Sequence, residues 1–229
     1  MVFAYLSMFL SQRYLPGLTC MCEQFARLGV QHPLVVVYND YTVDVLPREC
    51  TTAHRYVRLS ALESRLHQNA TRTTSRRLFQ REEFGRVLQK ILAWVLEDYS
   101  RVFLIDLDIF VNKNLDHIFH IAPARDILAN AACDPLTFNT GMVMLRPSVS
   151  VARALASIRV TDRRCELKRA DQSLLNRAFP QWTPLPLLVH TAHWTARRTR
   201  QNFSAHDAVH FVGEPKPWER FEACPRSWR

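Results

Sequence analysis

This sequence of 229 residues contains no apolar run long enough to cross a membrane. A membrane-spanning helix needs about 20 consecutive apolar residues. The opening segment, Met1 to Leu10, is apolar, but it has no basic residues at its start and no small-residue cleavage site after it. We therefore expect a buried first strand rather than a signal peptide, and no membrane segment.

The cysteines follow no regular framework, and nothing in their spacing resembles a four-ligand zinc site. We expect free and mostly buried thiols, and from them a reducing, cytoplasmic location. Such a location would leave the potential glycosylation sites at Asn69 and Asn202 unused. The six cysteines stand at positions 20, 22, 50, 133, 165 and 224.

Recognisable nucleic-acid-binding motifs are also absent, although the chain is basic. It carries 30 Lys and Arg against 21 Asp and Glu, a formal net charge of +9. That charge suits a phosphorylated substrate or a polyanionic partner. The basic residues are scattered, and no zinc-finger, homeodomain or aromatic RNA-binding motif accompanies them. Nucleic acid is therefore the less favoured partner.

The sequence does contain enough apolar residues for a proper core. Hydrophobic residues make up 48% of the chain and charged residues 22%, and no linker divides it. We predict one α/β domain over residues 1–229 with a mostly parallel sheet, because apolar β-branched strands alternate with amphipathic helices. Strands are expected at 2–10, 34–38, 101–110, 127–131, 138–147, 185–189 and 209–212. Helices are expected at 18–28, 81–98, 114–119, from 149 and from 171, with a polar loop or lid at 61–80.

The stretch that organises the chain is an apolar run ending in two acids, Asp106 and Asp108. Side chains alternate along a strand, so residues two apart point the same way and both carboxylates face one crevice. Ligands of open α/β sheets bind at the carboxyl ends of the strands, and carboxylates there suit a divalent ion that contacts phosphates. The pattern predicts a metal site, although the triplet taken alone fits a strand end with two solvated acids better.

Five stretches stand together in a particular order and spacing. They are Tyr14–Gly17, the helix around Lys90, Asp106–Asp108, Phe138–Gly141 with Asp171–Gln172, and His210–Trp218. Jointly they resemble glycosyltransferase family 8, the retaining, metal-dependent sugar transferases that include glycogenin and galactinol synthase. The resemblance covers most of the chain from the first strand to Trp218. It implies a single GT-A domain, whose Rossmann-like sheet binds a nucleotide-diphosphate sugar at the carboxyl edge of its strands.

The resemblance also implies a metal site and a cation for the leaving group. Asp106, Asp108 and His210 match the family's ligands for a divalent ion, manganese or alternatively magnesium. Lys216 matches the lysine that reaches the diphosphate, where it offsets charge on the departing nucleotide. Alone, His210 fits a satisfied core histidine and Lys216 a solvated surface lysine. The motif that the two residues share favours the functional interpretation.

Further residues are implied to bind the donor or to lie beside the reacting carbon. Ser11 and Tyr14 match positions that hold the uridine, with the tyrosine ring stacking on the base. Asp171 and Gln172 match the acid and amide beside the anomeric carbon, and with Lys216 they form the implied catalytic set. Asp171 alone also fits a helix N-cap. The other implied donor-binding positions are Arg81, Lys90, Leu107, Asp134, Asn139, Thr140 and Gly213.

We therefore expect a transferase that moves glucose or galactose from a UDP-sugar to a hydroxyl acceptor, with retention of configuration. Asp171 or Gln172 then either stabilises charge at the anomeric carbon or forms a covalent adduct. The alternative is a catalytically inactive module of the same fold that binds sugar nucleotides or nucleic acid. Ser11-Gln12 in the first turn and Lys168 depart from the family pattern, and both departures concern the identity of the donor.

The acceptor is where the resemblance to glycogenin ends. Glycogenin glycosylates a tyrosine of its own, between the Asp-Gln helix and the histidine-lysine motif. Here the interval from Asn176 to Val209 contains no tyrosine. We expect transfer in trans to a polyol, a saccharide or another protein, with residues 190–202 in the acceptor mouth. A homodimer is compatible with this arrangement.

Overall fold

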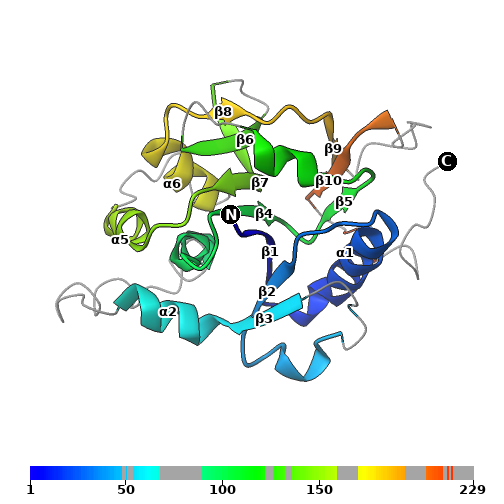
Figure 1. Cartoon of the computed structure of the whole chain (residues 1–229), viewed down its shortest axis with the longest axis horizontal. Helices are drawn as coiled ribbons and strands as arrows, with labels where there is room; N and C mark the ends of the chain where they lie inside the picture. The colour runs from blue at the N-terminus through cyan, green and yellow to red at the C-terminus, as the bar shows by residue number, and fades with distance from the viewer. Residues whose placement is uncertain are drawn as a thin grey trace.

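A seven-stranded sheet forms the middle layer of the molecule, as the computed structural model shows (Figure 1). The structure describes residues 1–47, 50, 54–67, 89–121, 126–132, 136–158, 170–193, 205–213, 216 and 218. In spatial order the strands are β3 (His54–Arg58), β2 (Leu34–Tyr38), β1 (Phe3–Phe9), β4 (Arg101–Ile105), β7 (Phe138–Leu145), β6 (Ile127–Ala131) and β8 (Thr183–Pro184). β7 runs antiparallel to both neighbours, and every other neighbouring pair is parallel. The predicted α/β fold with a mostly parallel sheet is confirmed.

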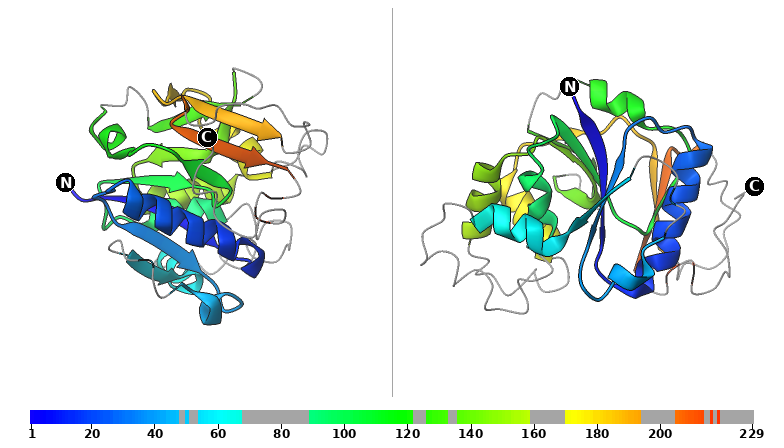
Figure 2. Two further views of the ribbon diagram at one scale, coloured as in Figure 1. Left: turned by 90° about the vertical axis from the view of Figure 1, so that its right-hand side faces the viewer. Right: turned by 60° about the horizontal axis from the view of Figure 1, so that its bottom comes forward.

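Two layers cover the two faces of this sheet (Figure 2). One face packs against α2 (Leu59–His67), η3 (Leu92–Val95), α5 (Val149–Ser157) and α6 (Ala170–Ala178). The opposite face packs against α1 (Leu15–Arg27), η4 (Asp116–His120) and a small sheet of order β5-β10-β9. The strands of that sheet are β5 (Ile109–Val111), β10 (Ala208–Val212) and β9 (Val189–His193), and short 3₁₀ turns η1 (Gln12–Tyr14) and η2 (Val43–Val45) complete the described elements.

Alternation along the central strands builds a separate core on each face. Leu6, Val35 and Leu104 belong to the core under α2, α5 and α6. Their neighbours Tyr5 and Phe103 belong to the core under α1. Because successive side chains point to opposite faces, a central strand must be apolar at nearly every position. This explains why the β-branched run of β2 marked a buried parallel strand so clearly.

The expected strand at 101–110 is divided in two. β4 ends at Ile105, residues 106–108 form a turn, and β5 then leaves the central sheet to pair antiparallel with β10. The chain therefore changes sheets at the acidic pair. The expectation that Asp106 and Asp108 lie on one continuous strand was wrong.

Other boundaries also differ from those expected. The start of the predicted loop at 61–80 is helical, because α2 continues to His67, and residues 68–80 lie outside the described part. The helix expected at 81–98 is α-helical at 89–91 and then tightens into η3, which ends at Val95. Residues 81–88 lie outside the described part. The edge strand β3 was not predicted.

The cysteines correct a second expectation. Cys22 of α1 forms a disulfide with Cys50, with the Cα atoms 5.2 Å apart, so not all thiols are free. Cys20 is buried, as expected. The other three cysteines and both glycosylation sites lie outside the described residues, and the cytoplasmic location stays a prediction. Among the described helices, none is long and apolar enough to cross a membrane.

Candidate active site

The turn between β4 and β5 holds the acidic pair by backbone hydrogen bonds. The amide of Asp106 donates to the carbonyl of Gly141 at 2.8 Å, and the amide of Phe211 donates to the carbonyl of Asp108 at 2.9 Å. The amide of Ile109 donates to the carbonyl of Asp106 and closes the turn. The turn is therefore fixed between β7 and β10. The two carboxylates meet because of this turn, and not because of the strand pleat.

Asp106, Asp108 and His210 form a cluster that fits a divalent ion. One donor atom from each lies within 4.8 Å of the others. Asp108 is 8% exposed and His210 7% exposed. Within the described part of the chain, the buried Oδ1 of Asp108 has no hydrogen-bond partner, and it lies 3.4 Å from Nε2 of His210. A buried carboxylate oxygen without a partner is costly, and a bound cation would satisfy it. Two carboxylates and an imidazole are common ligands of divalent metal ions in proteins.

Gly141 makes room for the imidazole of this cluster. A Cβ atom at position 141 would lie 2.5 Å from Cε1 of His210 and 2.9 Å from Oδ1 of Asn139. Oδ1 of Asn139 in turn accepts a hydrogen bond from the amide of Gly141 at 2.8 Å. A glycine in a strand allows another group to approach the backbone closely. The group that approaches it in the structure is a candidate metal-binding side chain.

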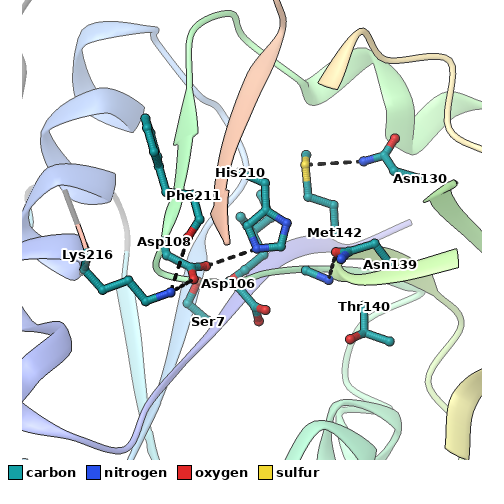
Figure 3. A network of polar contacts seen from close by, with 12 residues as sticks. Ser7, Asp106, Asp108, Asn130, Asn139, Thr140, Met142, His210, Phe211 and Lys216 are labelled. Atoms are coloured by element: carbon teal, nitrogen blue, oxygen red, sulfur yellow. Dashed lines mark hydrogen bonds and ion pairs between the residues drawn. The ribbon is translucent and has the colours of Figure 1, made fainter. Parts of the chain in front are cut away.

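Lys216 lies on the other side of Asp108 (Figure 3). Its ammonium donates to Oδ2 of Asp108 at 2.5 Å and to the carbonyl of Phe211 at 3.2 Å, and the residue is only 5% exposed. Burial by itself would raise the pKa of Asp108, but His210 and Lys216 outweigh burial and lower it to about 2. Asp108 is therefore ionised at neutral pH.

A second lysine joins the acidic pair to α6. Nζ of Lys90 lies 2.8 Å from Oδ2 of Asp106 and 2.9 Å from Oδ2 of Asp171. Thr140 contributes its carbonyl to Lys90 at 3.1 Å and donates its hydroxyl to Oδ2 of Asp171 at 2.9 Å. The structure thus brings four of the expected residues into one hydrogen-bonded network.

The pKa values in this network are set by burial and by Lys90, whose ammonium is shared by two carboxylates. Burial opposes the charge of Lys90, but the two carboxylates outweigh it and raise the lysine pKa. Burial raises the pKa of Asp106, and Lys90 offsets this only in part. For Asp171, burial is outweighed by Lys90 and by the hydroxyl of Thr140, so the pKa is lowered. Asp171 is therefore ionised at neutral pH.

The remaining expected residues lie at different distances from this centre. The ring of Tyr14 has its centroid 5.9 Å from Nζ of Lys216, and the exposed Ser11 precedes η1. Gln172 lies half-buried in the first turn of α6. The side chain of Leu107 is buried in the core, so only its backbone can face a ligand. Gly213 has a φ of 82° after β10, and Arg81 and Asp134 lie outside the described residues.

A pocket of about 290 Å³ borders His210 on the side of β6 and β7. Sequence reasoning missed most of its lining, because its walls come from short segments that meet only in the folded chain. One wall carries Asn130, whose amide donates to the sulfur of Met142 at 3.6 Å. The lining residues are Ala129, Asn130, Ala131, Asn139, Met142, Pro184, Leu185, Leu187, Leu188, Val189 and His210.

Three features together define the class of this protein. They are the seven-stranded sheet, the three-stranded sheet and the turn between them that carries Asp106 and Asp108. The fold is that of the GT-A glycosyltransferases. The glycosyltransferase GlyE of Streptococcus pneumoniae TIGR4 matches with a TM-score of 0.62 at 14% identity, over 96% of this chain and 57% of that one. An active-site mutant of LgtC matches with a TM-score of 0.60 at 11% identity, over 95% of this chain and 90% of that one. At such identities these structures show the fold alone.

The chain belongs to glycosyl transferase family 8, whose family model matches residues 6–222. Among curated proteins, rabbit (Oryctolagus cuniculus) glycogenin-1 is 32% identical over 154 residues. That match covers 62% of this chain and 44% of the rabbit protein, so the chain spans less than half of this relative. The resemblance to family 8 is confirmed. Family and fold together support a glycosyltransferase, and Asp106, Asp108 and His210 form a group that could hold a metal ion.

Proposed function

We propose that this chain is a retaining hexosyltransferase that moves glucose or galactose from a UDP-sugar to a hydroxyl acceptor in trans. One observation carries the proposal. Asp106, Asp108 and His210 converge at the end of β4, and Oδ1 of Asp108 lies buried there with no hydrogen-bond partner among the described residues. This is the edge at which open α/β sheets bind nucleotides. The three residues would hold manganese, or alternatively magnesium, which when bound neutralises charge on a diphosphate.

Lys216 is the residue that we propose meets the leaving group. Its buried ammonium lies beside Oδ2 of Asp108, next to the candidate metal site. Charge grows on the nucleotide diphosphate as the bond to the sugar breaks, and a fixed ammonium stabilises that charge. Tyr14, whose ring faces Lys216, is then on the side where the uracil base would stack. Ser11 lies nearby in sequence, and we assign it to the uridine.

Asp171 and Gln172 are proposed to face the anomeric carbon. Lys90 and Thr140 orient Oδ2 of Asp171, and the lowered pKa keeps its carboxylate charged. A fixed negative charge suits the positive character that the sugar acquires in the transition state. We propose that Asn139 contacts the donor sugar from the neighbouring strand.

The pocket beside His210 is our candidate for the acceptor. It lies between Asn139 and the segment before β9, and its lining combines apolar side chains with the polar side chains of Asn130, Asn139 and His210. Leu188, at its edge, is 56% exposed. β9 leads from this pocket into the residues that we expect at the acceptor mouth. Retention of configuration requires the acceptor hydroxyl to reach the anomeric carbon from the same face that the diphosphate leaves, and we propose that this pocket presents the hydroxyl there.

Release of UDP tests the proposal. Purified protein is incubated with manganese, a panel of UDP-sugars and hydroxyl acceptors, and UDP is measured with and without EDTA. We expect release from UDP-glucose or UDP-galactose, and NMR should show a product with the anomeric configuration of the donor. Asp108→Asn should lower the rate by a factor of about 10² or more. Asp98→Asn, which alters a half-exposed carboxylate paired with Arg55, is the matched control.

Two outcomes would count against this function. Unchanged activity in EDTA would contradict the metal requirement. Binding of UDP-sugars without UDP release, for every donor and acceptor tested, would favour the alternative of an inactive sugar-nucleotide binding module.

A further inference from the structure

We propose that Trp218 is a positioning residue that anchors the segment around Lys216, so that Lys216 stays at Asp108. The inference rests on the proposed function, because it assigns a task to the segment that carries the leaving-group lysine. Among the described contacts, Trp218 makes none with the side chains of Asp106, Asp108 or His210. Its effect would be exerted through Lys216, two residues earlier.

The indole contacts the start of α1, far away in the sequence. Nε1 of Trp218 donates to the carbonyl of Arg13 at 3.0 Å, across 205 residues of chain. Its ring meets the ring of Tyr14 edge-on, with centroids 5.7 Å apart and an interplanar angle of 68°. One hydrogen bond and one aromatic contact therefore fix both the position and the orientation of the side chain.

Gly17 provides the space for this contact. A Cβ atom at position 17 would lie 2.9 Å from Cη2 of Trp218 and would collide with the carbonyl oxygen of Leu107. Leu107 stands between the two acids of the candidate metal site. The same glycine thus packs against the indole and against the backbone of the acidic turn. The position of Trp218 is thereby set relative to the position of Asp108.

Lys216 needs such an anchor because its own side chain is flexible. A lysine loses up to about 2 kcal/mol of rotamer entropy when its ammonium is held in one place. Here Nζ is held by Oδ2 of Asp108 and by the carbonyl of Phe211. β10 ends at Val212, four residues before Lys216, and the indole of Trp218 is held two residues after it. Release of the indole would free one end of this short segment.

The first experiment does not depend on activity. Lysines are acetylated briefly, and the extent at each lysine is read by peptide mass spectrometry. In the wild-type protein Lys216 should react slowly, because its side chain is 6% exposed. In Trp218→Ala its acetylation should be faster by about tenfold, as local opening becomes frequent. Lys113, whose side chain is 54% exposed, is the internal reference and should not change.

Two further variants separate anchoring from general loss of structure. Trp218→Phe keeps a ring against Tyr14 but removes the hydrogen bond to Arg13, and should give an intermediate rate. Gly17→Ala adds a methyl group under an intact indole, and should raise Lys216 acetylation as Trp218→Ala does. Circular dichroism melting identifies variants that fail to fold. Unchanged acetylation of Lys216 in folded Trp218→Ala would overturn the inference.

A double-mutant cycle then links the anchor to catalysis. Lys216→Ala should lower kcat more than it raises KM, because the ammonium acts mainly on the transition state. Trp218→Phe should also lower kcat, by about tenfold, when Lys216 is present. In a protein that already carries Lys216→Ala, Trp218→Phe should not lower kcat any further. Independent, multiplying losses would show that Trp218 acts elsewhere and would overturn the inference.

The two experiments separate failure of the inference from failure of the function. If no UDP-sugar is turned over by the wild-type protein, the proposed function fails, yet faster acetylation of Lys216 in Trp218→Ala still supports the anchor. If turnover is normal and acetylation is unchanged, the function stands and the anchor is rejected.

Discussion

Nζ of Lys90 lies 2.9 Å from Oδ2 of Asp171, and this contact joins the helical turn before η3 to the start of α6. The same ammonium lies 2.8 Å from Oδ2 of Asp106. One lysine thus compensates a candidate metal ligand and a candidate catalytic acid, which sit on different elements. Without Lys90, the partly buried carboxylates of Asp106 and Asp171 would face each other with no cation between them. The carboxylate of Asp108 lies nearby.

Lys90→Met should therefore destabilise the protein. Removal of one partner from a partly buried ion pair leaves the other charges uncompensated, and we expect a loss of roughly 1–3 kcal/mol in the free energy of unfolding. Urea denaturation measures it. The matched control is Lys113→Met, which breaks the more exposed pair with Asp207 and should cost less than about 1 kcal/mol. Equal losses in the two variants would contradict this account of Lys90.

Gly141→Ala should weaken metal binding without unfolding the protein. The new methyl group would overlap the imidazole of His210 and push it away from Asp108. We expect manganese affinity to fall by roughly 10-fold to 100-fold, as when a supporting contact of a metal ligand is lost. Titration of manganese by electron paramagnetic resonance measures it. Gly29→Ala, at a surface glycine with a φ of 62° and no neighbour near its Cβ, should leave the affinity unchanged. Normal affinity in Gly141→Ala would refute the argument.

Much of the fold could be predicted because the signal was local. The run of β2 is apolar on both faces, and such a run has few alternatives to a buried parallel strand. β3 was not predicted because its sequence, His-Arg-Tyr-Val-Arg, is mostly polar and its partner β2 lies earlier in the chain. β5 has three residues, and it pairs with β10 from the other end of the sequence. Short or polar strands depend on partners that local patterns do not reveal.

The candidate site could also be predicted only in part from the sequence. The residue types and order in Asp106–Asp108 and His210–Trp218 pointed to one cluster, and the structure brings those residues together. Which lysine faces which acid could not be predicted, because those distances arise from the packing of the turn against β7, α6 and β10. The disulfide between Cys22 and Cys50 was missed for a similar reason, since it joins a helix to a later loop and follows no spacing rule.

Asp207 should make the small second sheet sensitive to acid. Burial by itself would raise its pKa, but the ammonium of Lys113 and the amide of Leu188 outweigh burial and lower it. A lowered pKa means that this contribution to stability is present above the unfolded-state pKa of about 3.9 and is lost as pH falls through the folded value. The free energy of unfolding of the wild type should therefore exceed that of Asp207→Asn by roughly 1 kcal/mol at pH 7. The difference should be smaller below about pH 4. Urea denaturation across this range tests it, and a pH-independent difference would contradict it.

The protein should not modify itself as glycogenin does. No tyrosine stands between Asn176 and Val209, where the resemblance to glycogenin would put the acceptor. Among the tyrosines of the described chain, Tyr5 and Tyr99 are buried, and Tyr41 is 82% exposed. Intact-mass spectrometry after incubation with manganese and UDP-glucose or UDP-galactose should show the unmodified mass, while UDP release depends on an added acceptor. Tyr41→Phe is the control for modification of that exposed ring. A ladder of hexose additions on the enzyme, in the wild type and in this variant alike, would overturn transfer in trans.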